Sequence, residues 1–218
     1  MKLYGYWRSS AAYRVRIALN LKGLEADHVS VHLVKDGGQQ HQADYVALNP
    51  QELVPTFIDN DADIGTEVKL TQSLAIIDYL DERYPDIGLL PTNIIDKALV
   101  RSMALLVACD VHPLNNLSIL QYLSGELKLE DEAKSQWYHH WVHKGLKALE
   151  VMLSQHSGQY CFGDKVTLAD VCLIPQVYNA KRFNVPLDAY PNIVRIWDNC
   201  HQLKGFRDAL PEAQADAS

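Results

Sequence analysis

The chain begins with a strand that runs directly into a helix. Residues 2–6 are predicted to form the strand, and the helix is predicted to end at about Lys22, because Gly23 is a natural C-terminal cap. Three apolar side chains share one face of this helix: Val15, Ala18 and Leu19. Residues 27–33 alternate apolar and polar side chains, which indicates a second strand with one buried face. This order favours a parallel pair of strands joined by a right-handed crossover.

The turn between the first strand and the helix has the chemistry of an anion site. Ser9 or Ser10 would cap the helix, because a serine hydroxyl accepts a hydrogen bond from a free N–H of the first turn. The start of a helix also carries a partial positive charge, and Arg8 adds a full charge beside the two hydroxyls. The alternative is that the serines are only caps and that the arginines, Arg14 and Arg16 included, form a solvated face.

After the second strand the chain continues through a polar loop at residues 35–42. Further elements are then predicted in turn: a short helix at 44–48, a strand at 54–58, a turn at 59–65, a strand at 68–70 and a helix at 72–84. The two strands can pair as an antiparallel hairpin. Residues 85–91 form a proline-bounded linker, so the first domain is predicted to be an α/β domain over residues 1–84.

Beyond the linker the pattern is helical, and no strand is predicted. Residues 96–123 favour a helix that Pro113 kinks or breaks, and residues 130–156 favour a long amphipathic helix. Thr167 and Asp170 have the spacing of a capping box at the start of a core helix. The second domain is therefore predicted to be all-helical. It is expected to span residues 92–218, with a frayed tail from residue 213 onward.

Composition argues against several classes of function. The net charge is −7, from 20 basic and 27 acidic residues, which disfavours nucleic acid because phosphate binding depends on clustered Lys and Arg. No window reaches the roughly 20 apolar residues of a membrane span, and no signal peptide is predicted, so a cytoplasmic location is expected. The cysteines show no metal-ligand spacing and are expected to be buried free thiols, with no metal bound: Cys109, Cys161, Cys172 and Cys200.

The stretch RSSAAYRVRIAL, residues 8–19, resembles the SSCxWRVRIAL signature of zeta-class glutathione transferases, whose family enzyme is maleylacetoacetate isomerase. The resemblance continues along essentially the whole chain. It implies a thioredoxin-like first domain, the two-domain glutathione transferase fold, glutathione as cofactor and a homodimer. The chain departs from the signature where Ala11 replaces the cysteine and Tyr13 replaces the tryptophan. Any chemistry in this loop therefore proceeds without a cysteine of the protein.

The resemblance also assigns roles at the strand–helix turn and at a later proline. Ser9 would activate the thiol of glutathione, with Ser10 as the second candidate and Arg8 beside them. A hydroxyl donor, a helix start and a nearby arginine all favour the thiolate, which is the form that attacks. Val54 would pair through its backbone with the cysteinyl unit, and Pro55 would be cis. The alternative is a proline that only trims an edge strand.

Other residues are assigned to the ends of glutathione and to the substrate. Gln72 and Ser73 would hold the γ-glutamyl end at a helix start, although Ser73 could be a plain cap. Gln40, followed by His41, matches the family's loop glutamine near the glycine end. The segment DVHPLNN would present three residues to the cleft: His112, Asn115 and Asn116. Arg8 and Arg182 match the arginines that bind substrate carboxylates in bacterial relatives that act on maleylpyruvate. The alternative is a lone surface arginine.

The implied reaction is the glutathione-dependent cis–trans isomerisation of maleylacetoacetate to fumarylacetoacetate, in aromatic amino-acid breakdown. A thiolate adds to the double bond, the resulting single bond rotates, and the thiolate leaves, so glutathione is not consumed. Three alternatives remain open. They are a maleylpyruvate isomerase, a general conjugating or peroxidatic glutathione transferase, and a non-catalytic module that binds ligands or partner proteins.

Overall fold

The structure is a computed structural model of the 218-residue chain, and it describes residues 1–60 and 65–217. Most of the turn predicted at residues 59–65 lies outside the described residues. The chain divides into two compact units. The first contains Met1–Gly88 and the segment from Gln202 onward, and the second contains Leu89–His201.

The first unit contains a sheet of four strands in the order β2-β1-β3-β4. The strands are β1 Lys2–Gly5, β2 Asp27–Ser30, β3 Thr56–Asp59 and β4 Val68–Thr71. β1 runs parallel to β2 and antiparallel to β3, and β3 runs antiparallel to β4. The predicted parallel pair and the predicted hairpin are therefore confirmed.

β2 is shorter than the strand predicted at residues 27–33. The N–H of Val31 still donates to the carbonyl of Gly5 at 2.7 Å. The next acceptor along the parallel ladder would be the carbonyl of Trp7, but this carbonyl accepts a hydrogen bond from Arg16 at 2.9 Å. Because the chain has turned away after β1, β2 has no partner to continue with.

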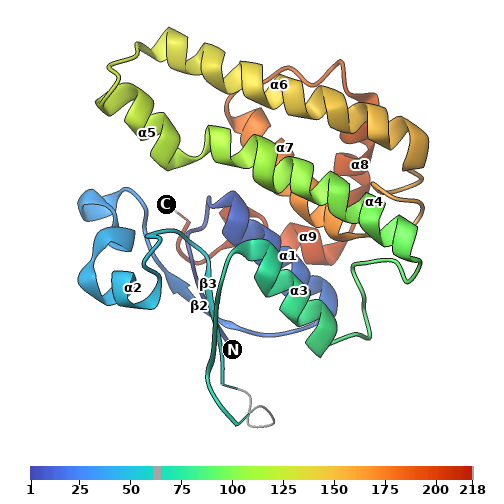
Figure 1. The fold of residues 1–218 in the computed structure, drawn as a ribbon, viewed down its shortest axis with the longest axis horizontal. Helices are drawn as coiled ribbons and strands as arrows, with labels where there is room; N and C mark the ends of the chain where they lie inside the picture. The colour runs from blue at the N-terminus through green and yellow to red at the C-terminus, as the bar shows by residue number, and fades with distance from the viewer. Residues whose placement is uncertain (61–64, 218) are drawn as a thin grey trace. The chain divides into compact units, whose positions relative to one another are not determined.

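The first unit also contains four α-helices in its described residues. They are α1 Ser10–Lys22, α2 Ala43–Leu48, α3 Ser73–Arg83 and α9 Lys204–Asp208. α1 ends at Gly23, which has the left-handed conformation (φ 66°) of the predicted cap. The predicted apolar face of α1 is buried, and α1 packs against α3 and α9 (Figure 1).

The segment from Gln202 onward packs on the first unit, whereas the sequence placed it in the all-helical domain with a frayed tail. Phe206 and Ala209 are fully buried. Beyond them, Pro211–Ala213 forms a 3-10 turn, and the carboxylate of Asp216 accepts a hydrogen bond from the backbone N–H of Trp7. The tail is therefore docked at least as far as Asp216. The polar composition of residues 213–218 gave no indication of these contacts, because the residues that this tail contacts lie near the N-terminal end of the chain.

The second unit is helical, as predicted. Its helices are α4 Ile94–Leu105, α5 Leu117–Gly125, α6 Asp131–His156, α7 Leu168–Arg182 and α8 Pro191–His201. Between α4 and α5 the chain forms a π-helical turn over Leu106–Val111 and a 3-10 turn over His112–Asn115. Pro113 lies in the 3-10 turn, which confirms the predicted break. In the described part of this unit, strand pairing is limited to one bridge between Ser157 and Gly163.

The predicted capping box begins α7. One carboxylate oxygen of Asp170 accepts hydrogen bonds from the N–H and the hydroxyl of Thr167, at 2.8 and 3.0 Å. The other accepts from the N–H of Cys161 at 2.8 Å. Burial raises the pKa of the Asp170 carboxyl, and the hydrogen bonds from Cys161 and Thr167 oppose that shift. This buried carboxylate ties the loop before α7 to the start of the helix.

Three of the four cysteines are buried free thiols, as expected: Cys161, Cys172 and Cys200. Burial raises the pKa of the Cys161 and Cys200 thiols, so both stay protonated. Cys109 is exposed, so the expectation was wrong for this residue. Val107 and Val111 turn inward from the same π-helical turn, which leaves Cys109 on its outer side.

In the described ranges, no helix has the length and apolar character of a membrane span, and no three metal-ligating side chains cluster.

Replacing Asp170 with alanine is expected to destabilise the second unit. The change leaves the N–H groups of Cys161 and Thr167 buried without an acceptor, which costs about 3 kcal/mol of the free energy of unfolding. Denaturant unfolding followed by tryptophan fluorescence measures the loss. Asp188→Ala, at an exposed position of the same unit, is the matched control and should unfold like the wild type. Equal midpoints for both variants would contradict this account of Asp170.

Candidate functional site

Ser9 is the N-cap of α1. Its Oγ accepts a hydrogen bond from the N–H of Ala12 at 3.2 Å, and its own N–H donates to the carbonyl of Tyr6 at 2.9 Å. Ser10 is the first residue of the helix and is buried. A hydroxyl that accepts in this way still has its proton to donate. Of the two serines, Ser9 therefore combines the cap with a hydroxyl that is only partly buried.

Arg8 is held in place by two aromatic neighbours. Its Nη2 and Nε donate to the hydroxyl oxygen of Tyr6 at 2.9 and 3.3 Å. Its guanidinium carbon lies 4.5 Å from the ring centre of Trp7, within the range of a cation–π contact. A full positive charge is thus fixed next to the capping serine, in addition to the partial charge of the helix start.

Arg14 and Arg16 are buried, with 2% and 4% of their surface exposed, so the solvated-face alternative is wrong for them. Nη1 of Arg14 donates to Oγ of Ser73 at 3.3 Å. Arg16 donates from Nη2 to the carbonyl of Trp7 at 2.9 Å and from Nε to the carbonyl of Ala209 at 3.1 Å. α1 is therefore tied to three other segments by charged side chains, and sequence periodicity carried no signal for these bonds.

The peptide bond between Val54 and Pro55 is cis, as the resemblance implied. The segment before it is held by Tyr45, whose hydroxyl donates to the carbonyl of Leu53 at 2.6 Å, and by Asn49, whose amide donates to the same carbonyl at 2.7 Å. Val54 itself is partly exposed. The carbonyl just before Val54 is therefore fixed by two donors, from Tyr45 and Asn49.

Gln72 precedes α3 with a positive φ of 69°. A non-glycine residue in this region is strained by about 1–3 kcal/mol, and such strain concentrates at binding sites. Its side-chain amide donates to Oε1 of Gln51 at 2.9 Å. Ser73 is buried, and its hydroxyl accepts from Arg14 instead of capping α3. The plain-cap alternative for Ser73 is therefore wrong.

Three of these features meet where the ends of β1, β3 and β4 lie side by side because of strand register. We call this end of the sheet its edge. Tyr4 of β1 pairs with Thr56 of β3, and Thr56 pairs with Thr71 of β4. The turn that leads into α1 follows β1, the cis Pro55 precedes β3, and Gln72 follows β4. Since both pairings are antiparallel, the end of β1, the start of β3 and the end of β4 lie together. This edge thus brings together two helix starts and the stretch before the cis proline.

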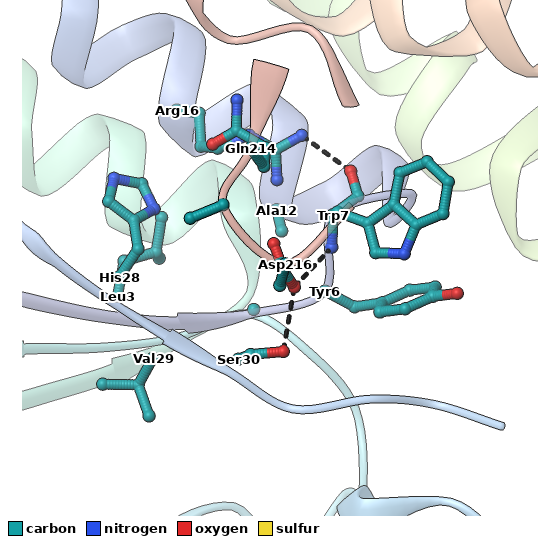
Figure 2. Close-up of a pocket in the computed structure, with 12 residues that line it drawn as sticks. Leu3, Tyr6, Trp7, Ala12, Arg16, His28, Val29, Ser30, Gln214 and Asp216 are labelled. Carbon is teal, nitrogen blue, oxygen red and sulfur yellow. Dashed lines mark hydrogen bonds between the residues drawn. The ribbon is translucent and has the colours of Figure 1, made fainter. Parts of the chain in front are cut away.

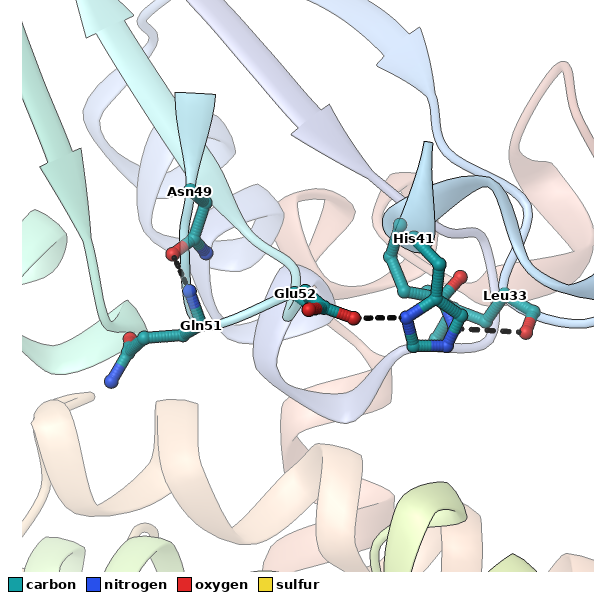
Figure 3. Close-up of polar contacts among 6 residues, drawn as sticks. Leu33, His41, Asn49, Gln51 and Glu52 are labelled. Carbon is teal, nitrogen blue, oxygen red and sulfur yellow. Dashed lines mark hydrogen bonds and ion pairs between the residues drawn. The ribbon is translucent and has the colours of Figure 1, made fainter. Parts of the chain in front are cut away.

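The polar loop contributes Gln40 and His41, and Figure 3 shows His41 beside Glu52. The amide nitrogen of Gln40 donates to the carbonyl of Leu33 at 3.2 Å and lies 3.0 Å from Nε2 of His41. His41 in turn pairs through Nδ1 with the carboxylate of Glu52. Gln40 is buried, so its side chain supports the loop and joins it, through the histidine, to the segment that leads to Val54.

The remaining candidates belong to the second unit, in the His112–Asn116 segment and at the end of α7. Asn116 caps α5, with its Oδ1 accepting from the N–H of Ser118 at 3.0 Å. Asn115 is buried, and its Oδ1 accepts from the side-chain amide of Asn179 at 3.4 Å, so it joins the His112–Asn116 segment to α7. Arg182 lies at the exposed end of α7, one turn after Asn179, with its guanidinium carbon 4.7 Å from the ring centre of Phe183.

Comparison with known proteins places these features in a family. A family model of the glutathione S-transferase N-terminal domain matches residues 3–88, and a model of the C-terminal domain matches residues 116–208. A probable maleylacetoacetate isomerase of Vibrio cholerae is 50% identical over 99% of this chain and 97% of its own.

Solved structures agree with these matches. A maleylpyruvate isomerase structure, described as a bacterial zeta-class glutathione S-transferase, has a TM-score of 0.93 at 43% identity and covers 100% of both chains. The maleylacetoacetate isomerase of Methylobacterium extorquens, solved with malonate and glutathione, has a TM-score of 0.92 at 40% identity and again covers 100% of both chains. The chain therefore belongs to the glutathione S-transferase family, within its zeta class.

Proposed function

We propose that this protein catalyses the glutathione-dependent cis–trans isomerisation of maleylacetoacetate to fumarylacetoacetate. The observation that carries the proposal is the convergence, at one sheet edge, of the α1 start with Ser9, the cis Pro55 and the strained Gln72. Relatives over the full chain length that are named for this reaction support it. A cytoplasmic location and a role in aromatic amino-acid breakdown belong to the same proposal, and the buried free thiols favour a reducing compartment.

The donors at this edge fit glutathione. The ligand is an extended tripeptide with a thiol and two carboxylates, and helix starts are suited to anions. The start of α3, with Gln72 and Ser73, would hold the γ-glutamyl carboxylate. The backbone of Val54 would pair with the cysteinyl unit. Gln40 and His41 would stand near the glycine end.

Each residue near the proposed thiol has a defined task. Glutathione, when bound, supplies the thiolate that adds reversibly to the conjugated double bond of the substrate. Ser9 would donate its hydroxyl proton to the sulfur, and the start of α1 would favour its negative charge. Arg8 would bind a substrate carboxylate and stabilise charge that develops on the conjugated oxygen. Ala11 replaces the family's cysteine, so the chain has no thiol of its own in this loop.

A maleylpyruvate isomerase is the second candidate. It requires the same chemistry on a shorter acid, and the maleylpyruvate isomerase structure that matches over the whole chain favours it. We propose that Arg182 binds a carboxylate of either acid, because a planar guanidinium forms two parallel hydrogen bonds with a carboxylate. A general transferase for apolar electrophiles would not need these arginines to bind a substrate carboxylate.

Removing the hydroxyl of Ser9 is expected to reduce isomerisation strongly. Ser9→Ala loses both the donor and the cap, whereas Ser9→Gly loses the donor and keeps most of the cap stability, so the pair separates the two roles. Both variants should form fumarylacetoacetate about 100-fold more slowly. Ser9→Thr and Ser10→Ala should stay close to wild type. Unchanged turnover in Ser9→Gly would exclude thiol activation by Ser9, and loss in Ser10→Ala alone would transfer the role to Ser10.

Replacing Arg182 with lysine tests the substrate assignment. The loss of a bidentate carboxylate contact should raise the KM for the maleyl acid about tenfold or more, with the KM for glutathione unchanged. Parallel assays with maleylacetoacetate and maleylpyruvate identify the preferred acid from the ratio of kcat/KM. Lys181→Met, at the neighbouring exposed position, is the control. An unchanged KM for both acids would show that Arg182 does not bind substrate.

We also propose a homodimer. α4 exposes large apolar side chains, with 81% of Ile94, 67% of Ile95 and 46% of Leu105 accessible, and such a group of side chains is suited to a partner surface. Light scattering at micromolar concentration should give twice the mass of one chain. The variant Leu105→Lys should lower this mass, whereas Leu127→Lys, at an exposed leucine outside α4, should not. A single-chain mass for the wild type would contradict the proposal.

A further inference from the structure

The peptide groups on both sides of Trp7 are held by side chains, as Figure 2 shows. The N–H of Trp7 donates to Oδ2 of Asp216 at 3.3 Å, and its carbonyl accepts from Nη2 of Arg16 at 2.9 Å. Oδ2 of Asp216 also accepts from the hydroxyl of Ser30 at 2.9 Å. The residue just before Arg8 is thus fixed by an acceptor from the far end of the chain and by a donor from α1.

Residues 209–216, which we call the strap, supply one side of this arrangement. The strap begins at the buried Ala209, whose carbonyl accepts from Nε of Arg16 at 3.1 Å. Its middle is ordered by Gln214, whose side-chain amide donates to the carbonyls of Asp208 and Leu210 at 2.9 and 2.8 Å. It ends at Asp216. Arg16 therefore binds the strap and Trp7 with the same guanidinium group.

Hydrogen bonds attach the last part of the strap to the rest of the unit. A cavity of about 220 Å³ lies beside it and is lined by β1, β2, α1 and residues 214–216 (Figure 2). Asp216 is only partly buried, and the two hydrogen bonds at its Oδ2 attach this part of the strap to Trp7 and to β2. The carboxylate of Asp216 thus holds the Trp7 N–H, as the guanidinium of Arg16 holds the Trp7 carbonyl.

The position of Trp7 determines the positions of the next residues. Its ring is buried, and the ring centre lies 4.5 Å from the guanidinium carbon of Arg8. The hydrogen bond from the N–H of Ser9 to the carbonyl of Tyr6 closes a tight turn that contains Trp7. A shift of the Trp7 backbone therefore moves both the charge of Arg8 and the hydroxyl of Ser9.

We propose that Asp216 is a positioning residue, which orients Arg8 and Ser9 through the backbone of Trp7. The strap thereby joins the end of the described chain to the turn that begins α1. This inference rests on the proposed function, since it assigns Asp216 to the site where the thiol of glutathione would be ionised. Asp216 itself takes no part in the reaction.

The test uses three variants of the full chain. Asp216→Ala removes the acceptor, and Asp216→Asn keeps an oxygen in its place. Asp208→Ala is the matched control, because the Asp208 side chain pairs with Lys204 in the segment that leads into the strap. Amide hydrogen exchange at Trp7 reports the contact. The ultraviolet absorbance of the thiolate, followed against pH with glutathione bound, reports its effect on the site.

In Asp216→Ala, the Trp7 amide should exchange at least tenfold faster, and the pKa of the bound thiol should rise. The kcat at neutral pH should fall about tenfold and recover at alkaline pH, because a one-unit rise in the thiol pKa leaves a tenth of the thiolate. The KM for glutathione should change little, since the contacts at Val54 and Gln72 are untouched. Asp216→Asn should be close to wild type, and Asp208→Ala should match it.

Two results would overturn the inference. The first is unchanged exchange at Trp7 in Asp216→Ala, and the second is faster exchange with an unchanged thiol pKa. If Asp216→Ala does not fold, wild-type behaviour in Asp216→Asn supports the inference, and loss of activity without a shift of its pH profile opposes it. Wild-type protein that binds no glutathione would contradict the proposed function, and exchange at Trp7 would still decide whether Asp216 fixes the turn.

Discussion

The site depends on the register in which β3 pairs with its two neighbours. Thr56 lies opposite Tyr4 on one side and opposite Thr71 on the other, so three chain segments emerge at the same sheet edge. Those segments are the turn into α1, the stretch before the cis proline and the strained Gln72. A shift of one residue in either pairing would invert the side chains of a strand and separate these groups.

Positive charge near this edge comes from one partly exposed and two buried arginines. Arg8 is partly exposed beside the start of α1, and Arg14 and Arg16 are buried. Buried arginines are costly unless their donors find acceptors. In this unit they bind Ser73 and the carbonyls of Trp7 and Ala209, so the desolvated charges join α1 to α3, β1 and the strap. The same bonds orient the residues assigned to glutathione.

Local patterns predicted much of this fold. Gly23 ends α1, Thr167 and Asp170 form the capping box, and Pro113 breaks the helical run, because each signal acts within a few residues of its own position. Long-range contacts were missed. The burial of Arg16 and the docking of the strap depend on partners near opposite ends of the chain, and no periodicity reports them. Cys109 was misjudged because its apolar surroundings in the sequence suggested burial, whereas Val107 and Val111 take the inward positions. The roles at the site came from the family signature, and its geometry came from strand pairing.

The central claim is that this chain ionises a thiol that it does not itself contain. Calorimetric titration of the wild-type protein with glutathione at neutral pH, in buffers of different ionisation enthalpy, measures the protons released on binding. We expect a proton to leave the thiol when glutathione binds, and S-methylglutathione to bind without this release. Binding of both ligands with no proton released would contradict it.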